Sequence, residues 1–475
     1  MRLRFLKLLC ACWFLVVGVA LAQSAAPTPA IAPRVDERVE LLSIVFRLAG
    51  NDEYNMNQLP AYSGDIDRYF GPYKEHPVVV TARQLAETQK IGYDAVMAMA
   101  ISLSAPPELK PLVPFTTDVP NRRWGVEAAE KFLPLLRNFY RDSKFAAFSE
   151  AHGPMYRMAE GRFASTLASV DFGWYRRFYG KSPDLSYHLV LGMNNGGGNY
   201  GPRLVFPDGR MELFSIMGCW THDEAGNPTY TDAEYLATII HEFNHSFVNS
   251  AVADHWTEFT GAQQIYEAMM KQMSTMGYGR AETMVNESLV RAAVIVYFQQ
   301  AGEGGAKNLK RIRQEQRYGF YWMDRLVDSL KQYDAKRSQY PSFSAYLPRI
   351  AEFFRALAPK VTAEAAAFDA KSAHVSGMEP FNNQAQDVDA SLKAITVVFD
   401  KPLDPAAGYS ISQARGGADQ YPVAGTPSFE AGGRRIVAPV QLQPNHVYSF
   451  VLTPVTFATA DGYPLVRYQV DFKTK

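Results

Sequence analysis

The sequence predicts an α+β fold in which a mostly helical domain is followed by an all-β sandwich. Apolar residues recur at helical intervals through most of residues 81–368, and short β patterns interrupt them between 187 and 217. From about residue 375 onward, short apolar strands alternate with turn signals instead. A chain of 475 residues is long enough to bury two separate cores.

The first 22 residues are predicted to be a secretory signal peptide. Arg2, Arg4 and Lys7 form a positive segment, residues 8–21 form an apolar run, and cleavage after Ala22 satisfies the small-residue rule. The apolar run is too short to favour a spanning helix, and no other segment approaches that length. We therefore expect a secreted or periplasmic protein without a transmembrane segment.

Charge and cysteine content narrow the range of partners. Removal of the signal peptide changes 48 basic and 48 acidic residues into 45 basic and 48 acidic ones. This mildly negative balance argues against a nucleic acid or an anionic membrane as partner. One cysteine, Cys219, then remains, so no intrachain disulfide can form, and we expect its thiol to be buried in the core.

Residues 23–35 are rich in proline and alanine and are predicted to form a linker, and the helical domain is expected to span residues 36–371. Its first element, at 38–48, is predicted to be a strand because apolar and polar residues alternate there. In order, the expected elements are a strand at 38–48, helices at 81–102, 125–148 and 154–169, strands at 187–192, 203–206 and 212–217, and helices at 231–249, 280–300, 318–332 and 342–356.

Residues 193–202 (MNNGGGNYGP) form a segment rich in glycine and asparagine. It is not a phosphate loop, because it lacks a G-K-[S/T] ending and a strand follows it. Two interpretations remain open. The segment is either a simple hairpin loop, or part of an edge strand and loop above the helix at 231–249, where an extended substrate adds as a further strand.

Residues 241–245 read His-Glu-Phe-Asn-His and match the pattern H-E-x-x-H. On an α-helix, His241 and His245 lie on the same face, so two imidazoles can hold one Zn²⁺. Glu242 follows the first histidine and can reach a water at that metal, which makes it the candidate general base of a metallohydrolase. The alternative is a helix with two surface histidines and no metal.

The residues around this motif predict a helix at 231–249. Thr231 and Glu234 have the spacing of a capping box, in which each side chain accepts a hydrogen bond from the other residue's backbone N–H. Five residues form one apolar stripe at helical intervals: Leu236, Ile239, Ile240, Phe243 and Phe247. The two histidines and Glu242 fall on another face and leave the core side together.

A catalytic zinc usually takes three protein ligands, so one more is needed. The continuation H-x-x-G-x-x-H fails, because Val248 and Ala251 occupy its glycine and histidine positions. Asp254 and His255 lie a little further along the chain and remain candidates, although their spacing matches no known pattern.

The remaining option for the third ligand is a glutamate on a second helix. Glu267 lies in an amphipathic stretch, where a solvated carboxylate is expected. Glu287 lies in the largely apolar segment 284–298, and a buried carboxylate is unfavourable unless it is paired or bound to metal. Arg291, four residues on, is its candidate partner. We favour Glu287 as the ligand over a metal-free Glu287–Arg291 ion pair.

Residues 239–249 (IIHEFNHSFVN) and 286–292 (NESLVRA) resemble a group of secreted bacterial gluzincin-like proteins, identified as domain of unknown function 4932. Residues 39–50 (VELLSIVFRLAG) and 91–100 (IGYDAVMAMA) also resemble this family. The resemblance covers most of residues 36–370.

This resemblance implies a zincin-like metallopeptidase fold. It carries His241, His245 and Glu287 over as metal ligands and Glu242 as the general base. It supplies no substrate.

Residues 375–475 are predicted to form a β-sandwich, with short strands at 392–399, 435–440, 446–452 and 468–472. Residues 388–403 (VDASLKAITVVFDKPL) also resemble the bacterial Ig-like domains of surface-layer and secreted proteins. The resemblance implies a module that binds or spaces. Cell-envelope material is its candidate partner, and no chemistry is expected there.

Together these observations predict a secreted, Zn²⁺-dependent metallopeptidase that acts on a peptide or protein substrate. Arg291, Tyr297 and His222 are candidates for stabilising the carbonyl oxygen of the substrate, and the sequence does not choose among them. Two rival functions remain open. One is a non-catalytic, zinc-containing binding or cell-envelope protein, which has no need of Glu242, and the other is a hydrolase of non-peptide amides.

Overall fold

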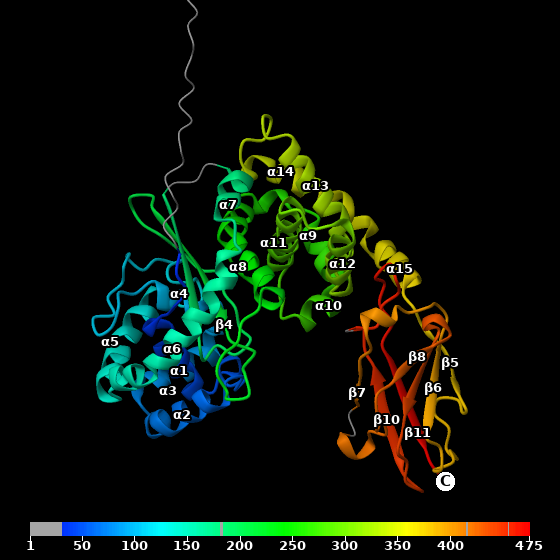
Figure 1. The fold of residues 1–475 in the computed structure, drawn as a ribbon. Helices are drawn as coiled ribbons and strands as arrows, with labels where there is room; N and C mark the ends of the chain where they lie inside the picture. Colours follow the sequence, from blue (N-terminus) through cyan, green and yellow to red (C-terminus); the bar gives the residue numbers. More distant parts are fainter. Residues whose placement is uncertain (1–30, 181–183, 415–416, 455) are drawn as a thin grey trace, which may run out of the picture. The chain divides into compact units, whose positions relative to one another are not determined.

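The computed structural model describes residues 31–180, 184–414, 417–454 and 456–475 (Figure 1). About half of the chain is helical, and antiparallel sheets make up its C-terminal part, so the predicted mixed α+β class is confirmed. The predicted signal peptide, residues 1–22, and the predicted linker up to residue 30 lie outside the described residues.

The N-terminal helices lie beside a small sheet, which some of them contact. They are α1 (Glu37–Ala49), α2 (Pro60–Phe70), α3 (Pro77–Gln89), α4 (Asp94–Ile101), α5 (Val126–Asp142), α6 (Phe145–Ala168) and α7 (Phe172–Tyr179). The three helical stretches predicted here are found. The stretch expected at 81–102 is two helices, because Lys90 adopts a left-handed conformation (φ 57°) and ends α3. Helices α2 and α7 were not predicted.

The strand predicted at 38–48 is wrong, because these residues belong to helix α1. Every residue from Arg38 to Ala49 is buried, so the helix has no solvent-facing stripe that would reveal a helical period. Its end signals were present in the sequence. The Asp36 side chain accepts from the Arg38 backbone N–H, and Gly50 (φ 99°) closes the C-terminus.

The N-terminal sheet has the strand order β1-β2-β4-β3. Its strands are β1 (Arg34–Val35), β2 (Leu185–Gly192), β3 (Arg203–Val205) and β4 (Met211–Gly218). Strand β2 pairs in parallel with both β1 and β4, and β3 pairs antiparallel with β4 at the edge of the sheet. Residues 34–35 are therefore a strand and not linker. The hairpin interpretation of residues 193–202 is also wrong, because β2 pairs with β4 and not with β3.

The second group of helices begins with α8 (Asp232–Asp254), which packs against both β4 and α11 (Ala281–Gln300) (Figure 1). The others are α9 (Ala262–Ala268), α10 (Met270–Thr275), α12 (Gly305–Arg317), α13 (Met323–Ala335), α14 (Phe343–Leu357) and α15 (Val361–Lys371). The helices predicted at 231–249, 280–300 and 342–356 are confirmed. The one predicted at 318–332 begins later, at Met323, and α12 precedes it.

The C-terminal strands form two antiparallel sheets, with the orders β5-β6-β9-β8 and β11-β10-β7. Their bounds are β5 (Val375–Glu379), β6 (Ala394–Phe399), β7 (Ile411–Gln413), β8 (Ser428–Glu430), β9 (Arg435–Pro439), β10 (Val447–Leu452) and β11 (Tyr468–Lys473). The buried side chains of both sheets, such as Val397 and Phe450, belong to one hydrophobic core. All four predicted strands are present.

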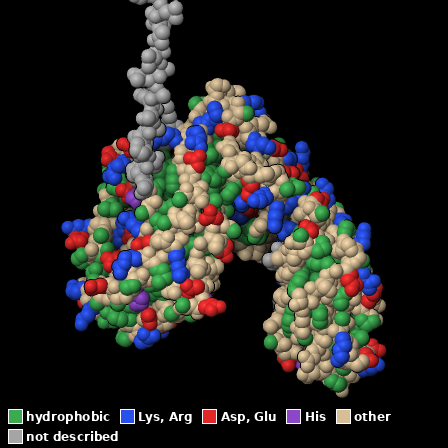
Figure 2. Space-filling model, viewed as in Figure 1, with side chains coloured by type: hydrophobic (Ala, Val, Ile, Leu, Met, Phe, Trp, Pro, Cys, Tyr) green, Lys and Arg blue, Asp and Glu red, His purple; other side chains and the backbone are tan. Residues whose placement is uncertain are grey.

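Short 3₁₀ helices complete the structure at Asp52–Tyr54, Gly71–Tyr73, Trp256–Glu258, Ala358–Lys360, Pro405–Ala407, Ala418–Gln420 and Ala431–Gly433. Cys219 is buried as predicted, and burial raises the pKa of its thiol to about 11. Over the residues that the structure describes, no helix is both long enough and apolar enough to cross a bilayer. Acidic and basic side chains are interspersed on the face drawn in Figure 2.

Candidate metal centre

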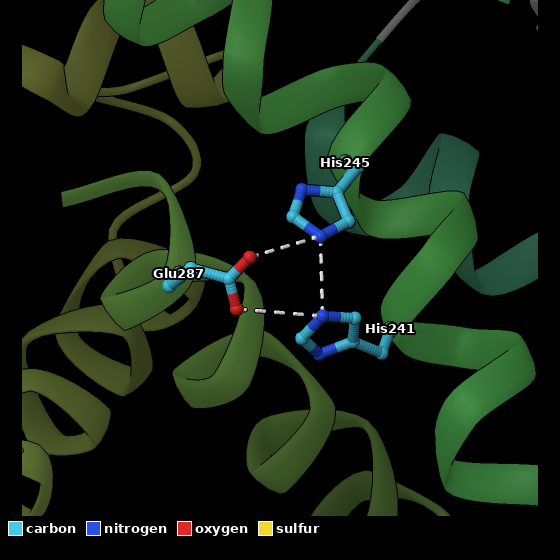
Figure 3. Close-up of side chains that lie close together, drawn as sticks. All are labelled: His241, His245 and Glu287. Carbon is cyan, nitrogen blue, oxygen red and sulfur yellow. Dashed lines mark hydrogen bonds and ion pairs between the residues drawn. The ribbon is translucent and has the colours of Figure 1, made fainter. Parts of the chain in front are cut away.

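His241 and His245 lie one turn apart on the same face of α8, with their imidazoles directed to one point (Figure 3). Their Nε2 atoms are 3.1 Å apart. The two side chains are 20% and 15% exposed, so they are sheltered but still reachable from solvent. The i, i+4 spacing of the motif thus produces the paired imidazoles that the sequence predicts.

Glu287 reaches the same point from α11 (Figure 3). Its Oε1 lies 3.4 Å from His245 Nε2, and its Oε2 lies 3.6 Å from His241 Nε2. One possible ligand atom from each of the three residues lies within 4.8 Å of the others. The structure therefore brings His241, His245 and Glu287 together into a cluster that could hold a metal ion.

Buried polar contacts fix α8 against its neighbours. Asn244, inside the H-E-x-x-H motif, is fully buried, and its amide donates to the Val290 carbonyl of α11 at 3.4 Å. The Tyr179 hydroxyl of α7 donates to the other end of the same amide at 2.9 Å. Phe247 stacks on the Tyr179 ring with centroids 4.5 Å apart. The second variable position of the motif thus sets the spacing between the two helices.

The tautomer of His245 follows from the contact that its Nδ1 atom makes. Nδ1 lies 3.1 Å from Oδ1 of Asn249, an acceptor, so Nδ1 carries the proton and donates. A neutral ring in this tautomer leaves the Nε2 lone pair free to bind a metal. Asn249 is one further turn along α8, and its position four residues after His245 was visible in the sequence.

Glu242 is a largely buried carboxyl group next to His241. Its residue is only 6% exposed, yet no donor among the described residues hydrogen-bonds to its carboxylate. Burial raises the pKa of Glu242 to about 7, and the negative charge of Glu287 adds to this rise. A carboxyl group with this pKa can both accept and release a proton near neutral pH.

A network of hydrogen bonds also reaches Oε2 of Glu287, the oxygen that faces His241. The Tyr278 hydroxyl donates to its Oε2 at 2.9 Å, and Nε of Arg291 donates to the same oxygen at 3.3 Å. Nη1 of Arg291 donates to Oε2 of Glu315 at 2.7 Å. In this network two carboxylates therefore face one guanidinium.

The protonation states suit metal binding. Burial lowers the pKa of His241 to about 3, so its imidazole is neutral at physiological pH. Burial also works against the charge of Glu287, but the charge of Arg291 and the hydrogen bond from Tyr278 favour the ionised form and act to lower its pKa. A neutral imidazole and an ionised carboxylate are the forms that bind metals.

The segment before β3 passes close to the backbone of α8. Tyr200 exchanges two backbone hydrogen bonds with Ile216 of β4, so the edge strand extends beyond the residues of β3 itself. A Cβ at Gly201 would lie 2.0 Å from the Glu242 carbonyl oxygen, and only glycine permits that approach. Arg203 donates to the Ser246 carbonyl at 3.2 Å. The edge strand predicted near this helix is present.

The capping box predicted at the start of α8 does not form. Thr231 is the N-cap residue, but its hydroxyl donates to Oε2 of Glu234 at 2.8 Å and accepts from no helix N–H. The two side chains bond each other instead, because a carboxylate is a strong acceptor for a hydroxyl and can reach it without folding back toward the backbone amide.

The other candidate ligands lie elsewhere. Glu267 is exposed and accepts from the Gln263 side chain at 2.9 Å. His255 bonds through its two ring nitrogens to Glu258 and Ser344, and Asp254 is exposed.

The three candidates for stabilising the carbonyl oxygen of a substrate lie in different parts of the structure. Arg291 is part of the Glu287 network. Tyr297 is ten residues beyond Glu287, about 15 Å along α11, and its hydroxyl accepts from the Asp171 backbone N–H at 2.7 Å. His222 is exposed, and its Nδ1 lies 2.9 Å from the Asp223 carbonyl oxygen. The structure thus joins Arg291, but neither Tyr297 nor His222, to the cluster.

The sequence interpretation missed Tyr278 and Glu315. Tyr278 lies in the turn between α10 and α11, and Glu315 lies on α12, a helix that was not predicted. Their contacts with Glu287 and Arg291 arise only from tertiary packing, so no local pattern could have indicated them.

The family model described as Domain of unknown function (DUF4932) matches residues 31–353. The chain belongs to this family. The DUF4932 region runs from β1 into α14 and therefore contains both helices of the candidate metal centre. The C-terminal strands lie beyond the matched residues.

No curated protein matches the chain. Three solved structures of the bacterial surface-layer protein SbsC are similar to it at 12% sequence identity. Its domains 1–6 match 52% of this chain and 34% of that chain with a TM-score of 0.18. Its N-terminal part matches 54% and 61% with a TM-score of 0.17, and rSbsC(31-844) matches 84% and 46% with a TM-score of 0.18. The chain spans less than two thirds of each of these structures.

Proposed function

We propose that this protein is a secreted, zinc-dependent metallopeptidase of the gluzincin type. His241, His245 and Glu287 bind Zn²⁺ in this proposal, and Glu242 is the general base. The observation that carries it is the cluster of His241, His245 and Glu287, whose possible ligand atoms lie within 4.8 Å of one another, with the largely buried Glu242 next to His241 in the motif.

The donor set fits zinc. Two imidazole nitrogens and one carboxylate oxygen are the protein ligands of many catalytic zinc sites, which keep a further position for water. Two nitrogens at ~2.0–2.1 Å from a tetrahedral ion are about 3.3 Å apart, and the two Nε2 atoms are 3.1 Å apart here. The side chains therefore need little movement to bind the ion.

The chemistry of such a site is amide hydrolysis. Zinc, when bound, supplies a Lewis acid that polarises a carbonyl and makes water more acidic. Glu242 accepts a proton from the attacking water as its oxygen bonds to the carbonyl carbon. When the C–N bond breaks, Glu242 delivers that proton to the leaving nitrogen. The buried surroundings that raise the pKa of Glu242 suit both transfers.

A peptide substrate is supported by the edge of the N-terminal sheet. Strand β3 is the last strand in the sheet order, and the segment that leads into it lies against the backbone of Glu242. An extended peptide that adds beside this edge would place its backbone near the metal centre. The C-terminal sheets, in this proposal, are an Ig-like module that binds or spaces at the cell envelope.

The test combines metal analysis with cleavage of a mixed peptide library by the mature protein. We expect about one zinc per chain, cleavage by the wild type, and turnover lower by about 10²–10⁴-fold in Glu242→Gln at equal zinc content. Glu40→Gln, which changes a buried carboxylate far from the motif in sequence, is the matched control and should cleave like the wild type. Absence of zinc from the wild type overturns the proposal. Zinc without peptide cleavage supports a binding protein or a hydrolase of other amides.

A further inference from the structure

The two oxygens of Glu287 lie in unlike surroundings. Oε2 accepts hydrogen bonds from the Tyr278 hydroxyl at 2.9 Å and from Nε of Arg291 at 3.3 Å. Oε1 faces His245 Nε2 at 3.4 Å, and no hydroxyl, amide or guanidinium of the described residues donates to it. Both oxygens face an imidazole, Oε1 that of His245 and Oε2 that of His241 at 3.6 Å (Figure 3). The difference is that Oε2 is also held by two hydrogen bonds from the protein, whereas Oε1 accepts none from the described residues.

We propose that Tyr278 and Arg291 are positioning residues that hold Oε2 of Glu287, so that Oε1 alone binds the metal. This inference rests on the proposed metal site and adds a control of coordination number to it. A carboxylate that binds through both oxygens fills one more position on the ion. Holding Oε2 in hydrogen bonds keeps that position available for water or substrate.

The orientation of the Tyr278 hydroxyl is determined by chemistry. Nη2 of Arg291 donates to the Tyr278 oxygen at 2.8 Å, and a guanidinium has no acceptor. The hydroxyl proton must therefore point elsewhere, and Oε2 of Glu287 is the acceptor within reach. Tyr278 thus relays the charge of Arg291 to one chosen oxygen of the ligand.

Arg291 is itself fixed in place. Its Nη1 donates to Glu315 of α12 at 2.7 Å, which leaves each side of the guanidinium assigned to a partner. The rings of Tyr278, Tyr318 and Phe320 lie between 5.2 and 6.0 Å from its central carbon. A planar group held by three acceptors and three rings has little freedom to turn, so it can act as a rigid support for Glu287.

Tyr278→Phe tests the inference, because it removes one hydroxyl and keeps the ring. We expect it to weaken Zn²⁺ binding by about 10–100-fold and to change the visible absorption of the Co²⁺-loaded protein, which reports coordination geometry. Tyr318→Phe is the matched control. Its ring also faces Arg291, but its hydroxyl accepts from Gln314 at 3.1 Å and does not reach Glu287. The control should leave both the affinity and the spectrum unchanged.

The double variant Tyr278→Phe with Glu287→Ala separates positioning from general destabilisation. If Tyr278 acts through Glu287, the double variant should bind Zn²⁺ no more weakly than Glu287→Ala alone. Should Tyr278→Phe fold poorly, Arg291→Lys replaces it, since lysine keeps the charge but cannot reproduce the fork. Wild-type affinity and spectrum in these variants overturn the inference while the metal site stands. Failure of the wild type to bind zinc overturns the proposed function instead.

Discussion

Helices α1 and α8 each carry one glutamate that the fold removes from water. Glu40 of α1 is 1% exposed and Glu242 of α8 is 6% exposed, and burial raises the pKa of both to about 7. Their partners differ. Glu40 accepts hydrogen bonds from the Tyr62 hydroxyl and from the Met193 backbone N–H, both at 2.7 Å. Glu242 accepts none from the described residues.

The difference agrees with a structural role for Glu40 and with the reactive role that the proposed function gives Glu242. Leaving a buried polar group without a hydrogen bond costs about 1–3 kcal/mol, and a fold avoids this cost where no function requires it. Glu40 avoids it by joining α1 to α2 and to the start of the glycine-rich segment. Glu242 has no such bonds among the described residues, and it lies one residue after a histidine of the candidate metal centre. Hydrogen-bond satisfaction therefore distinguishes the two glutamates better than burial or pKa does.

The largest effect should follow from removing the ligands beside Glu242. We expect His241→Ala and Glu287→Ala to reduce Zn²⁺ affinity by well over ~100-fold, because each removes a proposed direct ligand. Loss of a residue that only hydrogen-bonds a ligand costs up to about 100-fold. Isothermal titration of the purified variants measures this. The exposed Glu267 supplies the control, since Glu267→Ala should bind Zn²⁺ like the wild type. Full zinc stoichiometry and affinity in His241→Ala would show that the proposed metal site is wrong.

The possible metal ligands could be predicted from the sequence, but the residues that hold Glu287 and Arg291 in place could not. His241 and His245 are four residues apart on a helix with a clear apolar stripe, and Glu287 is a carboxylate in an apolar helix. Both signals are local in sequence, and the cluster in the structure joins them. Tyr278 and Glu315 are ordinary surface-type residues in sequence, and only the packing of α10, α11 and α12 brings them to Glu287 and Arg291.

The fold shows the same limit in helix α1. The strand was predicted because apolar and polar residues alternate between 38 and 48, where Arg38, Glu40 and Arg47 are among the polar ones. In the structure these side chains are buried and paired, as in the Arg47–Asp67 ion pair at 2.7 Å. A helix that is buried on every side carries no amphipathic period, so its cap residues, Asp36 and Gly50, were the usable signals.

An effect of intermediate size should appear in the pH dependence of stability. The pKa of Glu40 is raised from 4.5 to about 7, so between these pH values the folded state binds more protons than the unfolded state. Wild-type stability should therefore fall as pH rises through this window, by up to about 3 kcal/mol. Glu40→Gln lacks this titration. Its thermal midpoint should therefore fall less than that of the wild type as the pH rises from 5 to 8.

Glu267→Gln is the control for this pH series, because it removes an exposed carboxylate of the same type. Its midpoint should track the wild type at each pH. Parallel curves for Glu40→Gln and the wild type would show that Glu40 stays ionised when buried, and the contrast with Glu242 would then rest on hydrogen bonding alone.

The smallest effect is expected at the N-terminus of α8, where the helix that carries Glu242 begins without a side-chain cap. Since the Thr231 hydroxyl bonds the Glu234 carboxylate and no helix N–H, Thr231→Ala should cost less than about 0.5 kcal/mol. Ser342 provides the matched comparison, because its hydroxyl accepts from the Ala345 N–H at the start of α14. Ser342→Ala should cost about 1 kcal/mol and lower the thermal midpoint measurably. Equal losses in the two variants would mean that the capping box of α8 forms in solution after all, with the Thr231 hydroxyl turned toward the helix amides.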